Sequence, residues 1–236
     1  MKSIAIMQPY FFPYIGYFQL IAAVEKFIYR DDVQFIRRGW VHRNRLLIEG
    51  KAKYLTIPCR KGSQHRTIDK VEHALDNGQK ITRSYLLHQV ESYYSKAPFF
   101  KNVFPLVQKV LSLASPKVID ISIKSITETC TYLGLIPPME RSSEIKYRKQ
   151  GMVGELIDIC KQYDANYYIN ALGGKQLYDK DEFSEHGIEL KFLEPGEEIG
   201  YRQFDRPFVP RLSIIDVMMF NAPDRINEML HQYRMI

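Results

Sequence analysis

Polar and aromatic side chains gather near the start of the chain, in residues 8–19 (QPYFFPYIGYFQ). Pro9 and Pro13 restrict the backbone there, and Gly16 removes a side chain where a helix is expected to begin. A helix N-terminus presents unpaired N–H groups and a partial positive charge, which suit a phosphate. The segment therefore predicts a ligand site rather than a turn that only packs. The expected contacts are Gln8, Tyr10, Tyr14, Gly16 and Tyr17.

A second candidate segment covers residues 31–46 (DDVQFIRRGWVHRNRL). Adjacent carboxylates at a strand end point to different sides, so one of Asp31 and Asp32 is expected to face a site. Four arginines and the only tryptophan fall within residues 37–45, where they could bind a diphosphate and stack on a ring. A solvated basic hairpin is the alternative. The expected substrate contacts are Asp31, Gln34, Arg38, Trp40, Arg43, Asn44 and Arg45.

The same segment offers two candidates for a general base. His42 has an ordinary pKa near neutrality, so it is the first choice if an amine or hydroxyl must lose a proton. Asp32 is the rival. The other histidines lie apart without metal-ligand spacing, so no metal site is predicted.

A third candidate is the segment NALGGK, residues 170–175. After a strand, its backbone N–H groups and one ammonium could hold a phosphate from a second side. The spacing is not that of a Walker A motif, and a plain turn is the alternative. The expected contacts are Asn170, Gly173, Gly174 and Lys175.

Two strand–loop units are expected to carry these segments. A strand at 3–7, a helix from Tyr14 and a strand from Lys26 form the first. A strand-like run at 144–147, a helix at 151–165 and strands at 166–170 and 187–195 form the second. Such units make parallel strands whose following loops open at the carboxyl edge of a sheet, where ligands bind.

The intervening and final segments complete the prediction. Residues 46–57 indicate a hairpin and residues 67–74 a further strand. Helical periodicity then runs over about 78–134, and two helices are expected at the end, the first capped by Ser213. The sequence therefore predicts one α/β domain over 1–236, with a Rossmann-like parallel sheet and a helical insertion at about 78–134. The aromatic stripes of that insertion indicate core or a contact in a homodimer.

The composition indicates in which cellular compartment the protein works and which class of partner it binds. No apolar run approaches the roughly 20 residues of a membrane span, and the first residues lack the apolar core of a signal peptide. Three cysteines without a CxxC pair indicate a reducing compartment, so a cytoplasmic protein is expected. A net charge of +6 favours an anionic partner, either a phosphorylated small molecule or a nucleic acid.

Three runs together resemble the WbqC-like protein family, which is found in bacterial O-antigen and capsule gene clusters. They are MQPYFFPYIGYFQLI, FIYRDDVQFIRRGWVHRNRL and YYINALGGKQLYDKDEFSEHGIELKF, and the match spans nearly the whole chain. The resemblance implies a role in surface-polysaccharide and lipopolysaccharide biosynthesis.

A more distant resemblance is to the nucleotidylyltransferase-like α/β fold, on the stretch FFPYIGYFQLI. Tyr14 and Tyr17 stand where that superfamily has the histidines of its HxGH motif. Because tyrosine cannot carry a positive charge, adenylyl-transfer chemistry is not expected to accompany the shared layout.

The leading hypothesis is a transferase that moves an acyl or aminoacyl group onto a nucleotide-linked amino sugar. No cofactor is implied beyond that acyl or aminoacyl donor. One alternative is a nucleotidylyltransferase or ATP-dependent ligase. Another is a non-catalytic nucleic-acid or scaffold-binding module that places the arginines of 37–45 on phosphates.

Overall fold

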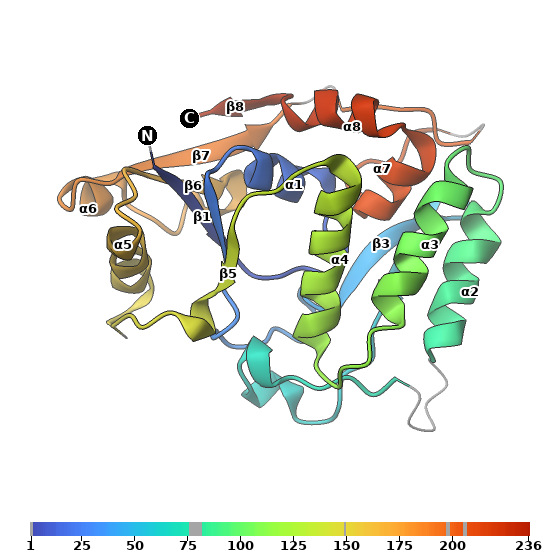
Figure 1. The fold of residues 1–236 in the computed structure, drawn as a ribbon, viewed down its shortest axis with the longest axis horizontal. Coiled ribbons are helices and arrows are strands. Elements are labelled where there is room, and N and C mark those ends of the chain that lie inside the picture. Colours follow the sequence, from blue (N-terminus) through green and yellow to red (C-terminus); the bar gives the residue numbers. More distant parts are fainter. Residues whose placement is uncertain (1, 76–81, 149, 197–198, 205–206) are drawn as a thin grey trace.

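A six-stranded sheet, in the order β5-β2-β1-β6-β7-β8, forms the core of one half of the molecule (Figure 1). The computed structural model describes residues 2–75, 82–148, 150–196, 199–204 and 207–236. The strands of the sheet are β1 (Ser3–Met7), β2 (Lys26–Tyr29), β5 (Met139–Arg141), β6 (Tyr167–Ala171), β7 (Glu189–Pro195) and β8 (Tyr233–Met235). All neighbours are parallel except β7 and β8.

Strand β1 lies between β2 and β6. The connection after β1 and the connection after β6 therefore run outward from the middle of the sheet in opposite directions. The loop after β1 leads to α1 (Ile15–Ala22) on one face, and the loop after β6 leads to α6 (Lys180–Ser184) on the other. This is the topological switch point at which open parallel sheets bind ligands. The α/β class and the Rossmann-like parallel sheet predicted from the sequence are confirmed.

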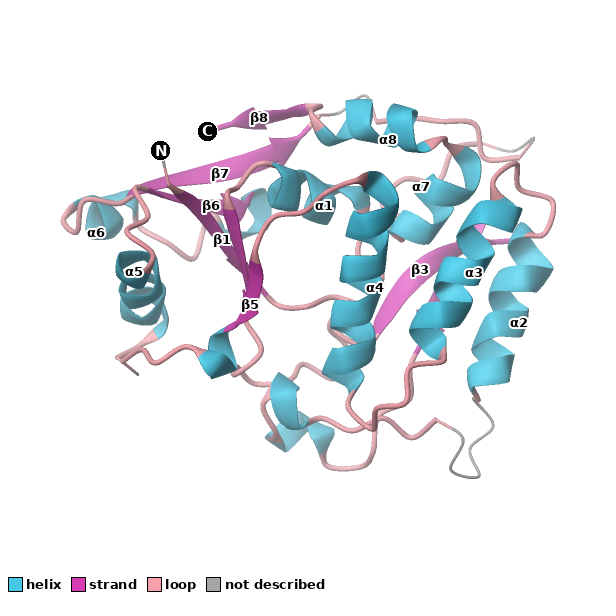
Figure 2. Cartoon of the chain, in the orientation of Figure 1, coloured by secondary structure: helices cyan, strands magenta, loops and turns pink. Residues whose placement is uncertain are grey.

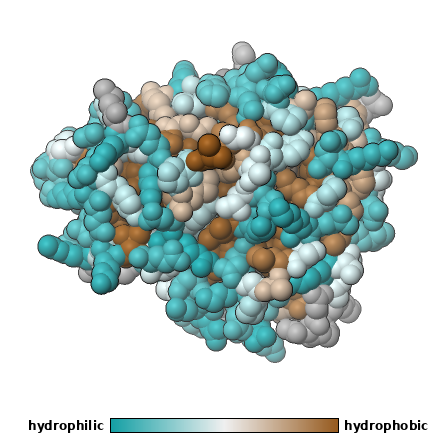
Figure 3. Space-filling view, in the orientation of Figure 1, coloured by the Kyte–Doolittle hydropathy of each residue, from teal (hydrophilic) through white to brown (hydrophobic). Residues whose placement is uncertain are grey.

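Helices cover both faces of the sheet because the strands alternate their side chains (Figure 2). Ile4 and Ile6 of β1 pack with α5 (Met152–Gln162) and α6, whereas Ala5 between them packs with α1. The helices α7 (Ile214–Phe220) and α8 (Pro223–Leu230) lie on the α1 side. In the view of Figure 3 the outer surface is mostly hydrophilic, with small hydrophobic patches.

The hairpin and the helices between β2 and β5 form the other half of the molecule. Strands β3 (Arg43–Ile48) and β4 (Lys51–Thr56) pair antiparallel, and Glu49 and Gly50 between them both have positive φ, as a type I′ turn requires. The helices that follow are α2 (Arg83–Tyr94), α3 (Phe100–Leu111) and α4 (Val118–Leu133). Of these, α3 contacts α7 and α4 contacts α8. The start of the predicted insertion, at 78, lies outside the described residues, and the assignment of one domain with an insertion stays a prediction.

Most predicted elements are confirmed, including the helix cap at Ser213, whose side chain accepts from the N–H of Ile215. Two predicted strands are wrong. Residues 67–74 form a short 3₁₀ turn with isolated bridges. Residues 144–147 begin at the last residue of another 3₁₀ turn, Ser142–Glu144, and continue without regular structure. The third parallel strand is instead β5, which follows Pro137 and Pro138 and is too short for an alternation to mark it.

Across the described ranges, no helix combines the length and the apolar character needed to cross a membrane. A cytoplasmic location and a homodimer stay predictions.

Candidate functional site

A cavity of about 1340 Å³ opens at the carboxyl edge of the sheet, where β1, β2 and β6 end. All three segments singled out in the sequence contribute to its lining. The predicted contacts that line it are Gln8, Tyr10, Tyr14, Gln34, Trp40, Asn44, Arg45, Asn170, Gly173 and Gly174. Such a volume lies above the range of ordinary small-molecule sites, roughly 300–1,000 Å³. It has room for a ligand of two parts.

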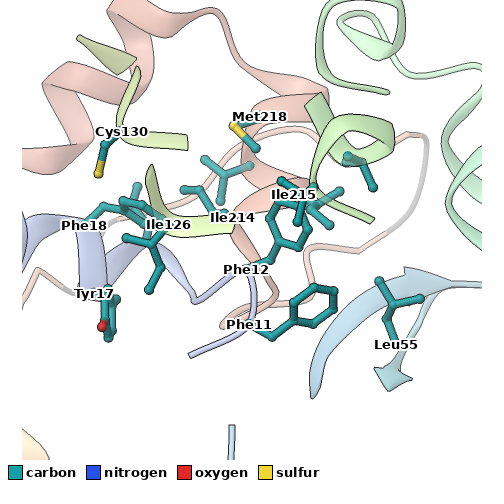
Figure 4. Close-up of a cluster of buried hydrophobic side chains, with 14 of the residues drawn as sticks. Phe11, Phe12, Tyr17, Phe18, Leu55, Ile126, Cys130, Ile214, Ile215 and Met218 are labelled. Atoms are coloured by element: carbon teal, nitrogen blue, oxygen red, sulfur yellow. The ribbon is translucent and has the colours of Figure 1, made fainter. Parts of the chain in front are cut away.

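The loop after β1 is held by two phenylalanines in the core. Phe11 and Phe12 are fully buried. Figure 4 shows Phe11 turned toward Leu55 of β4 and Phe12 beside Ile215 of α7. This segment therefore both packs and lines the cavity, because Phe11 and Phe12 lie in the core while Tyr10 and Tyr14, on either side of them, line the cavity.

Hydrogen bonds fix the backbone of the same loop from three distant elements. The amide of Asn44 on β3 donates to the carbonyls of Phe11 (3.1 Å) and Phe12 (2.9 Å). The N–H of Phe12 donates to Ser125 Oγ of α4, and Ser213 Oγ donates to the carbonyl of Phe12, each at 2.8 Å. These bonds hold Phe12 at a φ of 39°, which a non-glycine residue rarely adopts. The loop is a rigid part of the site.

This loop and the helix after it place three tyrosines at or beneath the cavity. Tyr10 and Tyr14 line the cavity, while Tyr17 lies buried beneath and donates from its hydroxyl to the Gln8 carbonyl at 2.9 Å. The ring of Tyr14 lies against Gly16, where a Cβ would come within 2.4 Å of Tyr14 Cε2. Burial raises the pKa of all three phenols, so they remain neutral hydrogen-bonding groups. Gly16 and Tyr17 thus support the cavity rather than line it.

Two arginines give one end of the cavity a positive charge. Arg45 and Arg211 both line it, and Arg45 Nη2 donates to the Arg211 carbonyl at 2.8 Å. The Arg45 guanidinium lies 5.4 Å from the ring centre of Trp40. Neither side chain forms an ion pair with any carboxylate of the described residues. Both guanidiniums therefore remain available to an anion.

At the other end of the cavity lies a buried ion pair. Arg30, at the end of β2, is 7% exposed and pairs with Glu155 of α5. Its other side donates to the Tyr147 hydroxyl at 2.7 Å and lies 3.8 Å from Asp32. Glu155 supplies the one carboxylate among the described residues that line the cavity.

The loop after β6 closes the cavity on the third side with hydrogen bonds of its own. Asn170 Oδ1 accepts from the N–H of Ala171 at 2.8 Å, and the N–H of Lys175 donates to the Leu172 carbonyl at 3.0 Å. Gly173 is exposed, and a Cβ there would meet nothing within 4 Å. This loop is the more open side of the site.

Comparison with known families gives a match to the model of the WbqC-like protein family over residues 8–228. The chain belongs to the WbqC-like protein family. A relative is the uncharacterized protein Rv1507c of Mycobacterium tuberculosis, 28% identical over 230 residues, which cover 95% of this chain and 97% of the relative. No solved structure matches. The resemblance to nucleotidylyltransferases stays a prediction.

Of the residues that line the cavity of this WbqC-like protein, all but Ile6 and Met7 fall within the matched range. Sequence reasoning missed several of them. Arg30 directly follows the β2 run, and Glu155 shares a face of α5 with Met152 and Leu156, so both carried a weak positional signal. Arg211, far along the chain, carried none. His65, to which the sequence gave no role, also lines the cavity.

Asp31 and Asp32 lie apart from the main cavity. Asp31 is fully buried and accepts from the N–H of Ser143 at 2.9 Å and from its hydroxyl at 2.8 Å, so it holds β2 to the turn after β5. Asp32 lines a second, smaller cavity of about 590 Å³ together with Ser142 and Tyr147.

His42 is buried beside Phe35, with ring centres 5.1 Å apart. Burial, followed by the charges of Arg43 and Arg37, lowers its pKa to about 4. Its Nδ1 is buried without a hydrogen bond to any part of the chain that is described. The imidazole is therefore neutral at physiological pH. Neither His42 nor Asp32 lines the larger cavity.

The other predicted cations point elsewhere. The guanidinium of Arg43 lies 4.2 Å from the ring centre of Tyr54, and its Nε donates to the Gly39 carbonyl at 3.3 Å. Arg38 and Lys175 are exposed and do not line the cavity. A role for these residues, and for His42 or Asp32 as base, stays a prediction.

Proposed function

We propose that this WbqC-like protein transfers an acyl or aminoacyl group onto a nucleotide-linked amino sugar in the biosynthesis of bacterial surface polysaccharide. One observation carries the proposal: Arg45 and Arg211, without carboxylate partners in the described residues, line a large cavity at the switch point of a parallel sheet. The family resemblance supports the polysaccharide context.

Each part of such a ligand has a complement in the cavity. The diphosphate suits the two guanidiniums, which bind phosphate oxygens in pairs. The indole of Trp40, already beside Arg45, offers a face for the base. The amides of Gln8 and Asn170 can donate to and accept from sugar hydroxyls. The remaining volume leaves space for the acyl donor.

In the transfer, the amine nitrogen forms a bond to the acyl carbon of the donor. The bond between that carbon and the leaving group of the donor breaks, and the nitrogen loses a proton to a base. A buried, neutral His42 would reach this proton only through a group that lines the cavity.

Thermal unfolding with UDP, dTDP, GDP and ADP tests the proposal. A ligand that binds the folded state at 100 times its Kd stabilises it by roughly 2.7 kcal/mol, so at least one diphosphate is expected to raise the Tm. Arg45→Met is expected to abolish that rise, whereas Arg38→Met, an exposed arginine outside the cavity, keeps it.

The absence of any shift with all four diphosphates and their sugar-linked forms contradicts the proposal. Release of pyrophosphate from ATP would instead favour the nucleotidylyltransferase or ligase alternative. Oligonucleotide binding that weakens steeply with salt and with Arg38→Met would favour the nucleic-acid-binding alternative.

A further inference from the structure

Charged side chains line the cavity at two places. Arg45 and Arg211 come from β3 and the segment before α7, whereas Glu155 comes from α5, which lies across β1 from them (Figure 1). At the α5 end, Arg30 is flanked by Glu155 and by Asp32, 3.8 Å away, so two carboxylates surround one guanidinium. The positive charge of Arg30 is therefore shared between two carboxylates, and it only partly neutralises Glu155.

One of the two carboxylate oxygens of Glu155 is placed to bind a ligand. Its Oε2 pairs with Arg30, which fixes the side chain, while its Oε1 makes no hydrogen bond to any described residue. The side chain is 15% exposed, and that exposed part lines the cavity. A carboxylate held in this way can accept a hydrogen bond without losing the ion pair that stabilises it.

We infer that Glu155 binds the protonated amino group of the sugar and so selects amino sugars over their hydroxy counterparts. The inference rests on the proposed function, because it assumes that the nucleotide end of the ligand lies at Arg45 and Arg211. An ammonium donates a hydrogen bond to Oε1 and adds the attraction between its positive charge and the carboxylate, whereas a hydroxyl can donate a hydrogen bond to the same oxygen but brings no charge. The two arginines and the carboxylate of Glu155 thus match a ligand that is anionic at one end and cationic at the other.

Calorimetric titration of two matched ligands tests this selection. The amino and hydroxy sugars linked to the same diphosphate are compared at pH 7, UDP-glucosamine against UDP-glucose where UDP binds, or the matched pair on whichever diphosphate binds. We expect the amino form to bind about tenfold tighter, about 1.4 kcal/mol. Glu155→Gln is expected to remove that preference and to leave the affinity for the diphosphate alone within about twofold. Glu182→Gln, the same change at an exposed position on α6, keeps the preference.

The outcomes separate this inference from the proposed function. If no diphosphate binds, both fail. If the diphosphate binds but wild type shows no preference, or Glu155→Gln retains it, only the role of Glu155 is overturned. Glu155→Asp covers the case in which Glu155→Gln fails to fold, because it keeps the charge beside Arg30 and draws the carboxylate back by one methylene. This variant is expected to lower the preference, and an unchanged preference in it overturns the inference.

Discussion

The loops after β1 and β6 meet at one edge of the sheet, yet they are held in different ways. The first has two fully buried phenylalanines and hydrogen bonds from β3, α4 and the start of α7. The second is held by bonds between near neighbours, with Gly173 exposed. Topology brings both loops to the cavity, but only long-range packing makes one of them rigid. The rigid side of the cavity carries Arg45, Arg211 and the tyrosines, whereas the loop after β6 forms its more open side.

Removing the amide beneath the first loop is expected to have the largest effect. Asn44→Ala leaves the buried carbonyl of Phe11 without a partner and that of Phe12 with Ser213 Oγ alone, which should lower the free energy of unfolding by about 3 kcal/mol. Asn170→Ala, at the end of β6 before the second loop, loses only local bonds, to Ala171 and Tyr178, and should cost about 1 kcal/mol. Urea unfolding measures both. Equal losses would contradict the difference between the loops.

Acid should weaken the rigid side through His42. The pKa of His42 is about 4 in the folded protein and about 6.5 when unfolded, so below pH 6.5 the unfolded state takes up a proton that the folded state does not. The stability is complete above pH 6.5 and falls toward pH 4, by about 3 kcal/mol there. His42→Leu should flatten this part of the Tm against pH curve, while the exposed His88→Gln should not. If His42→Leu loses as much stability in acid as the wild type does, the loss arises from groups other than His42.

Substitution by alanine should have different effects at Gly16, on the rigid side of the cavity, and at Gly173, on the open side. Gly16→Ala drives a Cβ to within 2.4 Å of the Tyr14 ring, so the ring must move. Because alanine favours the helix by about 1 kcal/mol, stability should change little, and the affinity for the bound nucleoside diphosphate should fall about fivefold. Gly173→Ala meets nothing within 4 Å and should leave both unchanged. Titration calorimetry checks the affinities, and a larger loss at Gly173 would reverse the assignment of the rigid side.

The smallest effect is expected at Lys175. Its side chain is exposed and does not line the cavity, so Lys175→Met should weaken diphosphate binding by less than about twofold, against about tenfold for Arg45→Met. The same titration compares the two variants. A loss at Lys175 as large as that at Arg45 would show that the second loop contributes its ammonium to the phosphate, as the sequence predicts.

Much of the site could be predicted because a simple rule connects sequence to position. Gln8 and Tyr14 follow β1 and Asn170 lies at the end of β6, and parallel strands deliver such residues to one edge of the sheet. Strands β1, β2, β6 and β7 were readable from their apolar runs for the same reason. Short edge strands such as β5 and β8 carry too few residues for a pattern, and they were missed.

The sequence by itself determined the fold class, the family and the edge at which a ligand would meet the sheet, because these depend on local periodicity and on motifs that lie within short runs. Only the tertiary structure decided which polar side chains reach the cavity. It buried Asp31 and His42, turned Arg43 onto Tyr54, and brought Arg211 and Glu155 to opposite ends of one space. The direction of a side chain in a loop depends on contacts with residues far away in the chain, and no short-range pattern encodes them.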